Sequence, residues 1–122
     1  MSGLGPKFVQ LANTARGAIQ CCDPTEVQQQ LASNTPPVLI DVREANEWQA
    51  GHVQGAVHLS KGMLECKIEQ LVPNPQTPIV LYCSGGYRSA LAAYNLKQMG
   101  YDKVISMEGG FSLWQKLGYP VE

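Results

Sequence analysis

The sequence predicts an α/β domain in which helices cover both faces of a central, mostly parallel sheet. The chain has 122 residues, of which 44% are hydrophobic and 16% charged, and this composition suits one packed core. Short, continuous apolar runs at residues 38–40 and 79–82 are typical of strands that are buried on both faces. Segments with helical spacing of their apolar residues separate such runs, which is the pattern of parallel strands joined by helices.

Residues 1–19 are expected to form a helical extension, and residues 20–122 the domain itself. The apolar side chains that recur in the extension at spacings of three or four are Phe8, Leu11, Ala12, Ala15 and Ile19. The next helix begins at Asp23, which caps it, with Pro24 in the first helical position and Glu26 completing a capping box. Two consecutive prolines then break the chain before the first apolar run.

The later elements rest on the same two patterns, apolar runs and helical spacing. In chain order they are a helix at 44–50, a strand at 56–59, a helix through Leu64, Ile68 and Leu71, a strand at 79–82, a helix at 88–99, a strand at 104–105 and a helix at 111–117. Glycine follows three of these helices, as Gly51, Gly100 and Gly118, where it readily takes the conformation that ends a helix. With the run at 38–40, the local patterns predict four strands.

Charge and hydropathy exclude several classes of protein. Nine Lys and Arg residues face ten Asp and Glu residues, which gives a net charge of −1 and no basic excess for nucleic acid or an anionic membrane. Apolar runs stop far short of the ~20 residues that span a bilayer. The first twenty residues also lack the apolar run of a signal peptide. We therefore expect a cytoplasmic protein.

Four cysteines and two histidines are the candidates for a metal site or for disulfides. The cysteines are Cys21, Cys22, Cys66 and Cys83. They form no CxxC pair, and neither histidine lies near one of them in the sequence. We expect no metal, no organic cofactor and no disulfide framework. Three of the thiols, Cys21, Cys22 and Cys66, are expected to pack as small apolar residues, although an exposed one could act as a resolving thiol.

The fourth thiol, Cys83, follows the strongest strand pattern and so lies at the carboxyl edge of the sheet, where α/β proteins bind ligands. The residues after it are Ser84, Gly85, Gly86, Tyr87, Arg88 and Ser89. Two glycines allow a tight turn whose N–H groups converge, and the start of the next helix adds further donors. Arg88 adds a positive charge. Although a cysteine that ends a strand is often just buried, this loop favours a Cys83 that carries negative charge.

Several separated motifs resemble those of rhodanese domains. The matching segments are Asp41-Val42-Arg43-Glu44, Glu47-Trp48, residues 51–56, residues 83–89, Gly109-Gly110 and Trp114. Over residues 20–122 the chain resembles a single-domain rhodanese, and the resemblance implies a five-stranded parallel sheet. It also implies a thiosulfate sulfurtransferase activity, in which Cys83 takes up a sulfane sulfur as a persulfide and passes it to cyanide or a thiol acceptor.

Two alternative functions belong to other classes. The chain could be a sulfur carrier or docking module that hands the persulfide sulfur to a protein partner. A phosphatase of the related fold is less favoured, because those enzymes place five residues between Cys and Arg, whereas four separate Cys83 from Arg88. The loop matches neither the pattern of thiosulfate enzymes nor that of 3-mercaptopyruvate enzymes, and thiosulfate is preferred because Arg88 supplies the one charge of the loop.

Other residues in the motifs are expected to support the site. Asp41 and Arg43 follow a strand at the same edge of the sheet and should form hydrogen bonds or ion pairs that hold neighbouring loops. His52 is interpreted as a hydrogen-bonding loop residue, because a thiolate that the loop already favours needs no base. Gly109 and Gly110 are expected to meet a backbone requirement before the last helix.

Overall fold

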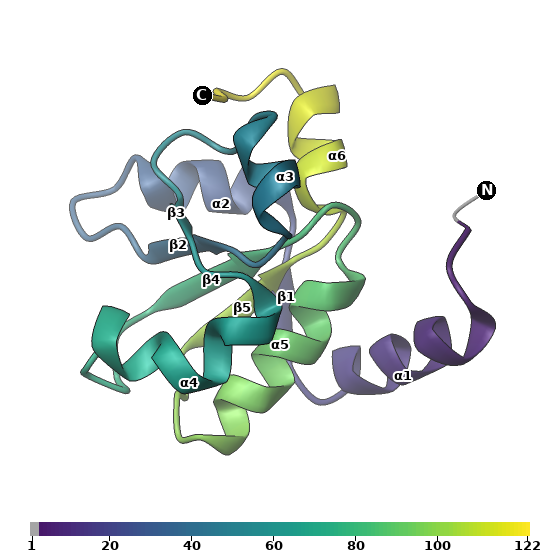
Figure 1. Ribbon diagram of the computed structural model, residues 1–122. Helices are drawn as coiled ribbons and strands as arrows, with labels where there is room; N and C mark the ends of the chain where they lie inside the picture. Colours follow the sequence, from purple (N-terminus) through teal and green to yellow (C-terminus); the bar gives the residue numbers. More distant parts are fainter. Residues whose placement is uncertain (1–2) are drawn as a thin grey trace.

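The computed structural model describes residues 3–122 and confirms the predicted α/β fold (Figure 1). The strands are β1 (Gln20–Cys22), β2 (Val38–Asp41), β3 (Val57–His58), β4 (Ile79–Tyr82) and β5 (Val104–Met107). The helices are α1 (Pro6–Arg16), α2 (Pro24–Leu31), α3 (Ala45–Gln49), α4 (Lys61–Leu71), α5 (Tyr87–Gln98) and α6 (Gly110–Lys116). The sheet has the order β1-β5-β4-β2-β3, and its neighbouring strands are all parallel.

Two apolar cores, one on each face, hold the sheet. On one face α4 and α5 pack against the strands through side chains such as Leu64, Ile68 and Leu96, which are fully buried. On the other face α2 and α6 pack through Val27 and Trp114. Figure 1 shows these two layers of helices above and below the strands. Because β4 is central, all four of its residues are buried, which explains its continuous apolar sequence.

The start of α2 agrees with the capping box that the sequence predicts. The backbone N–H of Glu26 donates to Asp23 Oδ1 at 2.9 Å, and the backbone N–H of Asp23 donates to Glu26 Oε1 at 3.2 Å. Pro24 occupies the first turn, where its missing N–H is not needed. These bonds begin α2 at a defined residue directly after β1.

Strand β1 is the element that the sequence patterns did not predict. Its three residues, a glutamine and two cysteines, form no apolar run, and Cys22 alone is buried. The strand exists because Gln20, Cys21 and Cys22 pair in register with β5 at the edge of the sheet. It supplies the fifth strand that the resemblance to rhodanese domains implied.

Two details of the predicted packing are wrong. Leu11 is 59% exposed, because α1 buries a narrow face through Ala12 and Ala15. Cys66 is exposed on α4, and its thiol donates to the carbonyl oxygen of Met63 at 3.3 Å, so it does not pack in the core.

Cys22 does pack in the core, where burial raises the pKa of its thiol to about 12. Cys21 is partly buried, and its pKa is raised mainly by the same desolvation.

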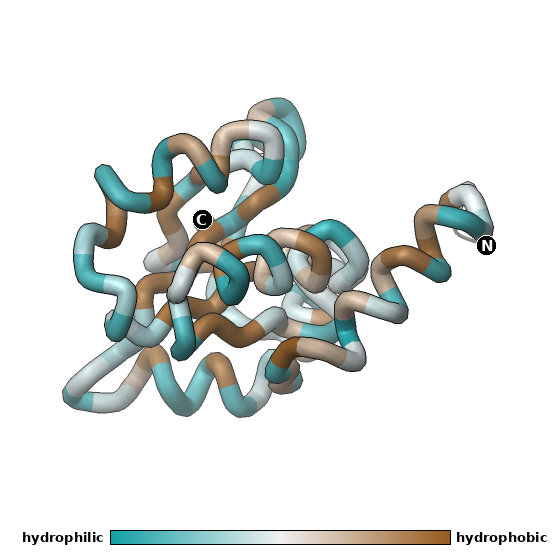
Figure 2. The backbone as a smooth tube through the Cα atoms, turned by 90° about the horizontal axis from the view of Figure 1, so that it is seen from below, coloured by the Kyte–Doolittle hydropathy of each residue, from teal (hydrophilic) through white to brown (hydrophobic). Residues whose placement is uncertain are grey.

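Helix α1 lies beside α5 and projects past the rest of the molecule (Figures 1 and 2). Apolar and polar segments alternate along it in Figure 2, as expected of a helix with one packed face. Near the end of α5, the ammonium group of Lys97 donates to the carbonyl oxygen of Ala18, just after α1, at 2.7 Å and so extends the contact between the two helices. Among the described residues, no helix has the length and apolar character needed to cross a membrane.

Candidate active site

Cys83 lies between the end of β4 and the start of α5, and it is 1% exposed. Its Sγ accepts a hydrogen bond from the backbone N–H of Gly86 at 3.1 Å and a second from the backbone N–H of Ser89 at 3.4 Å. Ser89 is in the third position of α5, so the sulfur occupies the place where a side-chain oxygen usually caps a helix. Two N–H dipoles and the positive end of α5 therefore point at this sulfur.

The turn that aims these N–H groups depends on Gly86. Gly86 has a φ of +96°, in the left-handed region that favours glycine, and it is the N-cap of α5. Gly85 has an ordinary φ, and a Cβ there would meet nothing closer than the ring of Tyr87 at 3.8 Å. Of the two glycines that the sequence analysis singled out in this loop, only Gly86 is required by the backbone.

The other side of the loop is held by the start of α6. The backbone N–H of Phe111 donates to the carbonyl oxygen of Cys83 at 2.8 Å, and that of Ser112 donates to the carbonyl oxygen of Ser84 at 3.1 Å. Gly110 has a φ of +54°, and an ideal Cβ on it would collide with the carbonyl oxygens of Cys83 and Ser84. A side chain at Gly110 would therefore push α6 away from the loop.

Two buried hydroxyl groups continue from the sulfur into the protein. Cys83 Sγ lies 3.6 Å from Ser89 Oγ, which lies 2.8 Å from Ser106 Oγ on β5. Both serines are at most 1% exposed. A thiol can donate to Ser89, and a thiolate can accept from it, because hydroxyl groups rotate to serve either state. Ser106 was not singled out from the sequence, although a polar residue in a buried strand is a usable signal.

Arg88 is paired with a carboxylate that sequence reasoning did not include in the site. Its two terminal nitrogens donate to Glu47 Oε1 at 2.8 Å and to Glu47 Oε2 at 3.1 Å, and Ser84 Oγ donates to the same carboxylate at 3.0 Å. Hydrogen bonds from Arg88 are the main reason that the pKa of Glu47 falls to about 2. The pKa of Arg88 is raised, chiefly by Glu47, with a smaller contribution from Cys83.

This pairing changes the expected role of Arg88. From the sequence, Arg88 is expected to add a positive charge beside the sulfur, but in the structure Glu47 on α3 neutralises most of that charge. Glu47 belongs to the Glu47-Trp48 motif, and this membership was the one sign in the sequence that Glu47 contributes to the site. Glu47 and Arg88 are 41 positions apart in the chain, so local sequence patterns do not indicate that they form an ion pair.

Asp41 and Arg43 form a buried ion pair at the end of β2. Arg43 Nη2 donates to Asp41 Oδ2 at 2.8 Å and to the carbonyl oxygen of Gly51 at 2.7 Å, and both residues are at most 4% exposed. The guanidinium carbon of Arg43 lies 4.4 Å from the ring centroid of Phe111. The pair thus joins β2 to the loop after α3 and to α6, the helix that holds the Cys83 loop.

His52 is engaged elsewhere than at the sulfur. Its ring stacks on Trp48 with centroids 3.4 Å apart, its Nδ1 lies 3.1 Å from the carbonyl oxygen of Trp48, and its Nε2 lies 3.6 Å from Glu122 Oε1. These contacts link α3 to the last residues of the chain. Among the described residues, no group of three His, Cys, Asp or Glu side chains is placed to hold a metal ion.

A cavity of about 380 Å³ opens beside Cys83. It is lined by Leu4, Phe8, Cys83, Ser84, Gly85, Tyr87, Arg88 and Ser112. Most of these residues belong to the loop and to the start of α5, but two come from α1 and the segment before it. The structure therefore brings together the predicted loop residues with part of the N-terminal extension.

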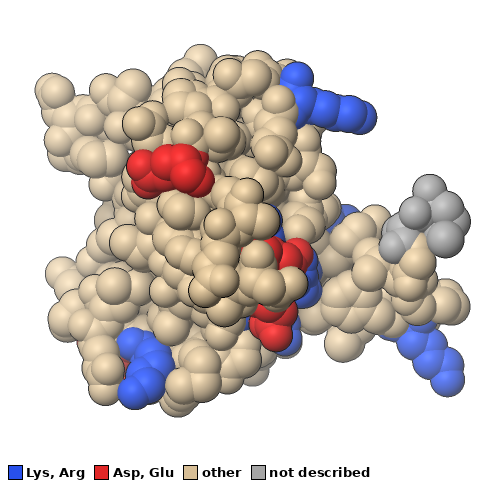
Figure 3. Space-filling view, turned by 45° about the horizontal axis from the view of Figure 1, so that its top comes forward, with Lys and Arg blue, Asp and Glu red and all other residues tan. Residues whose placement is uncertain are grey.

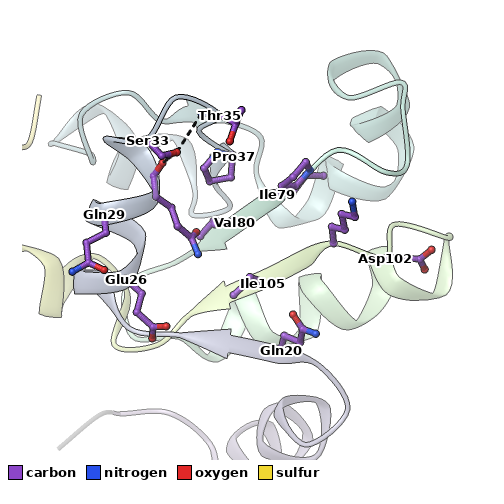
Figure 4. Close-up of a pocket in the computed structure, with 13 residues that line it drawn as sticks. Gln20, Glu26, Gln29, Ser33, Thr35, Pro37, Ile79, Val80, Asp102 and Ile105 are labelled. Atoms are coloured by element: carbon purple, nitrogen blue, oxygen red, sulfur yellow. Dashed lines mark hydrogen bonds between the residues drawn. The ribbon is translucent and has the colours of Figure 1, made fainter.

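A larger hollow of about 620 Å³ lies near the amino ends of β4 and β5 (Figure 4). Gln20, Glu26 and Gln29 contribute to it from β1 and α2, and Asp102 from the turn before β5. It contains no cysteine, and its residues come from the edge of the sheet opposite Cys83. This hollow is therefore separate from the candidate site at Cys83.

Charged side chains are scattered over the face drawn in Figure 3 and form no broad basic patch there. Where the N-terminal part meets the rest of the molecule, acidic and basic side chains lie next to one another. The net charge of −1 agrees with this view. An anion at Cys83 would thus be held mainly by backbone N–H groups.

The chain matches the family model of the rhodanese-like domain over residues 23–117, and it belongs to that family. A thiosulfate sulfurtransferase from Pseudomonas aeruginosa is 25% identical with a TM-score of 0.83, over 94% of this chain and 22% of that one. A polysulfide-sulfur transferase homodimer from Wolinella succinogenes is 28% identical with a TM-score of 0.81, over 95% of this chain and 87% of that one. The family and these neighbours support a role in sulfur transfer.

A third similar structure carries a different description. A protein of unknown function from Rhodopseudomonas palustris, described as a possible tyrosine phosphatase, is 29% identical with a TM-score of 0.83, over 100% of this chain and 97% of that one. The fold is therefore shared by proteins to which different chemistry has been ascribed, and the site must decide between them.

Gly110→Ala should destabilise the protein by at least about 2 kcal/mol, because alanine would have to take the positive φ of this position and its Cβ would collide with two carbonyl groups. Urea denaturation followed by circular dichroism measures the change. Gly62→Ala is the matched control, since a Cβ on this helical glycine meets no atom within 4 Å. The control should unfold at an equal or slightly higher urea concentration, and equal losses in both variants would contradict the role of Gly110.

Glu47→Gln should destabilise the protein in a pH-dependent way. Its pKa is lowered from 4.5 to about 2 in the folded chain. Such a carboxylate stabilises the folded state above its unfolded pKa, and this stabilisation is lost as the pH falls through the folded pKa. The difference in free energy of unfolding between wild type and variant should be constant from pH 7 to about 5, then shrink between about pH 4.5 and 2.

Urea denaturation at each pH measures this difference. Glu69→Gln is the control for removing one carboxylate charge, because Glu69 is exposed on α4. A Glu47→Gln difference that persists unchanged down to pH 2 would show that the ion pair with Arg88 does not stabilise the fold.

Proposed function

We propose that this protein is a sulfurtransferase that moves a sulfane sulfur from a donor such as thiosulfate to cyanide or a thiol acceptor through a persulfide on Cys83. One observation carries the proposal. Cys83 lines a cavity, and its sulfur accepts hydrogen bonds from the N–H groups of Gly86 and Ser89. A sulfur held in this way is suited to bear negative charge and to act as a nucleophile.

In the first step, the Cys83 thiolate attacks the outer sulfur of thiosulfate. A bond forms between Sγ and that sulfur, the S–S bond of thiosulfate breaks, and its electron pair leaves with sulfite. The products are Cys83–S–S⁻ and sulfite. The N–H groups of the loop are the natural donors for the negative charge of the persulfide, as in an oxyanion hole.

In the second step, cyanide attacks the outer sulfur of the persulfide. The bond between this sulfur and Sγ breaks, its electron pair stays on Sγ, and thiocyanate leaves. The Cys83 thiolate is thereby restored, which makes the cycle ping-pong. Neither step changes the net number of protons or needs an added oxidant. A reducing compartment such as the cytoplasm would keep the thiol available.

Two competing functions make different demands on the same loop. A sulfur carrier would form the same persulfide but pass it to a protein partner, with slow turnover on small acceptors. A phosphatase, suggested by the description of the structure from Rhodopseudomonas palustris, is less favoured. The loop has four residues between Cys83 and Arg88, and Arg88 is engaged by Glu47.

Incubation with thiosulfate should add one sulfur atom to the wild-type protein, detected by intact mass under non-reducing conditions. Cys83→Ser should abolish the gain, because it removes the attacking thiolate. Cys66→Ser is the matched control, since it removes an exposed thiol and should leave the gain intact. A gain that survives Cys83→Ser, or no gain with thiosulfate, would refute this donor and nucleophile.

Addition of cyanide to the loaded protein separates the alternatives. Rapid release of thiocyanate supports the enzyme, whereas a long-lived persulfide supports the carrier. Release of phosphate from an aryl phosphate that is lost in Cys83→Ser would favour the phosphatase instead.

A further inference from the structure

Helix α1 is fixed to the Cys83 loop by more than its contact with α5. Arg16 Nη2 donates to the carbonyl oxygen of Gly86 at 3.3 Å, and its guanidinium carbon lies 5.2 Å from the ring centroid of Tyr87. Ala12 and Ala15 are buried against the rest of the molecule. The N-terminal extension, which precedes the residues matched by the family model, therefore has a defined position beside the reactive sulfur.

From this position, the extension supplies one wall of the cavity at Cys83. Leu4 and Phe8 line the cavity, and the ring centroid of Phe8 lies 6.3 Å from that of Tyr87 with the planes tilted by 52°. Phe8 is partly buried, so one part of its ring remains accessible. Tyr87 at the start of α5 and these two side chains together give the cavity an apolar side.

The side of the cavity formed by Leu4, Phe8 and Tyr87 offers no charged group to a ligand, so an anionic donor would be bound by the N–H groups of the loop and not by this side. Arg88 is the only charged residue among the described residues that line the cavity, and its guanidinium group is engaged by Glu47 at 2.8 and 3.1 Å. The volume of about 380 Å³ is also much more than cyanide fills, and it falls in the ~300–1,000 Å³ range of pockets for small organic ligands. Both facts favour an uncharged organic group in this space.

We propose that the acceptor of the sulfur is a small organic thiol with an uncharged apolar group, which packs against Leu4, Phe8 and Tyr87. This inference rests on the proposed function. Phe8 and Leu4 then determine which acceptors are used. In the reaction, the acceptor sulfur bonds to the outer sulfur of Cys83–S–S⁻, and the bond between that sulfur and Sγ breaks with its electron pair left on Sγ. The acceptor proton ends on the outer sulfur, so R–SH and Cys83–S–S⁻ give R–S–SH and Cys83–S⁻.

The test compares acceptors on protein already loaded with sulfur from thiosulfate. The probes are 2-phenylethanethiol, 3-mercaptopropionate and cyanide, which are apolar, anionic and minimal acceptors. Wild type should show a higher kcat/KM for 2-phenylethanethiol than for 3-mercaptopropionate. Phe8→Ala should lower the ratio of kcat/KM for 2-phenylethanethiol to that for cyanide by about tenfold, mainly through KM, because an apolar contact surface is lost.

Two further variants sharpen the result. Leu11→Ala is the matched control on the same helix, because Leu11 is 59% exposed and does not line the cavity; its ratios should equal those of wild type. Phe8→Lys should shift preference toward 3-mercaptopropionate, since it places a cation at the wall. Circular dichroism and thermal unfolding check that each variant is folded.

The outcomes separate the two proposals. If wild type takes up sulfur and transfers it to cyanide, but the acceptor ratios are the same in wild type, Phe8→Ala and Phe8→Lys, the acceptor site is refuted and the sulfurtransferase stands. If wild type takes up no sulfur, the proposed function fails, and the acceptor site fails with it.

Discussion

The convergence of two backbone N–H groups on one sulfur is the constraint on which the rest of the site depends. Gly86 and Ser89 direct their N–H groups at the Cys83 sulfur, while the carbonyl groups of Cys83 and Ser84 point to α6. Helix α6 binds those carbonyls with its first N–H groups, and Gly110 lets it approach. The start of α5 and the start of α6 thus hold different peptide units of the same loop, and the position of the sulfur follows from both.

Electrostatics at the site come from dipoles more than from charges. The carboxylate of Glu47 offsets Arg88, and the chain as a whole is near neutral. A loop that relies on N–H groups can bind a small anion at short range without attracting every anion in solution. A near-neutral protein can therefore surround the Cys83 sulfur with N–H donors and still keep an apolar wall beside it.

Local sequence patterns were sufficient where short-range chemistry decides the structure. Neighbouring residues alone determine three such features: the apolar run of β4, the capping box at Asp23 and the glycines around the loop. They placed Cys83 at the correct edge of the sheet. The resemblance of separated motifs to rhodanese domains implied the five-stranded sheet and the family, and the sheet and the family match confirm both.

Other features could not be predicted locally because their causes are tertiary. Strand β1 has a poor strand sequence and is formed by pairing with β5. The ion pair of Glu47 with Arg88 joins residues that are distant in the chain. Likewise, helical spacing predicted α1 but could not show that its small alanines would face α5 and leave Leu11 in solvent.

The hydrogen bond from Arg16 to Gly86 spans 70 positions of the sequence, and the loop also needs α6, which follows it by more than twenty residues. Contacts of such separation form slowly, because closing a long loop of chain costs conformational entropy before the contact is made. During synthesis from the N-terminus, Cys83 is made well before α6 exists to hold its carbonyl group. The thiol is therefore a plain cysteine on a nascent chain, and the N–H groups and carbonyl contacts around it are assembled only when both flanking segments have folded.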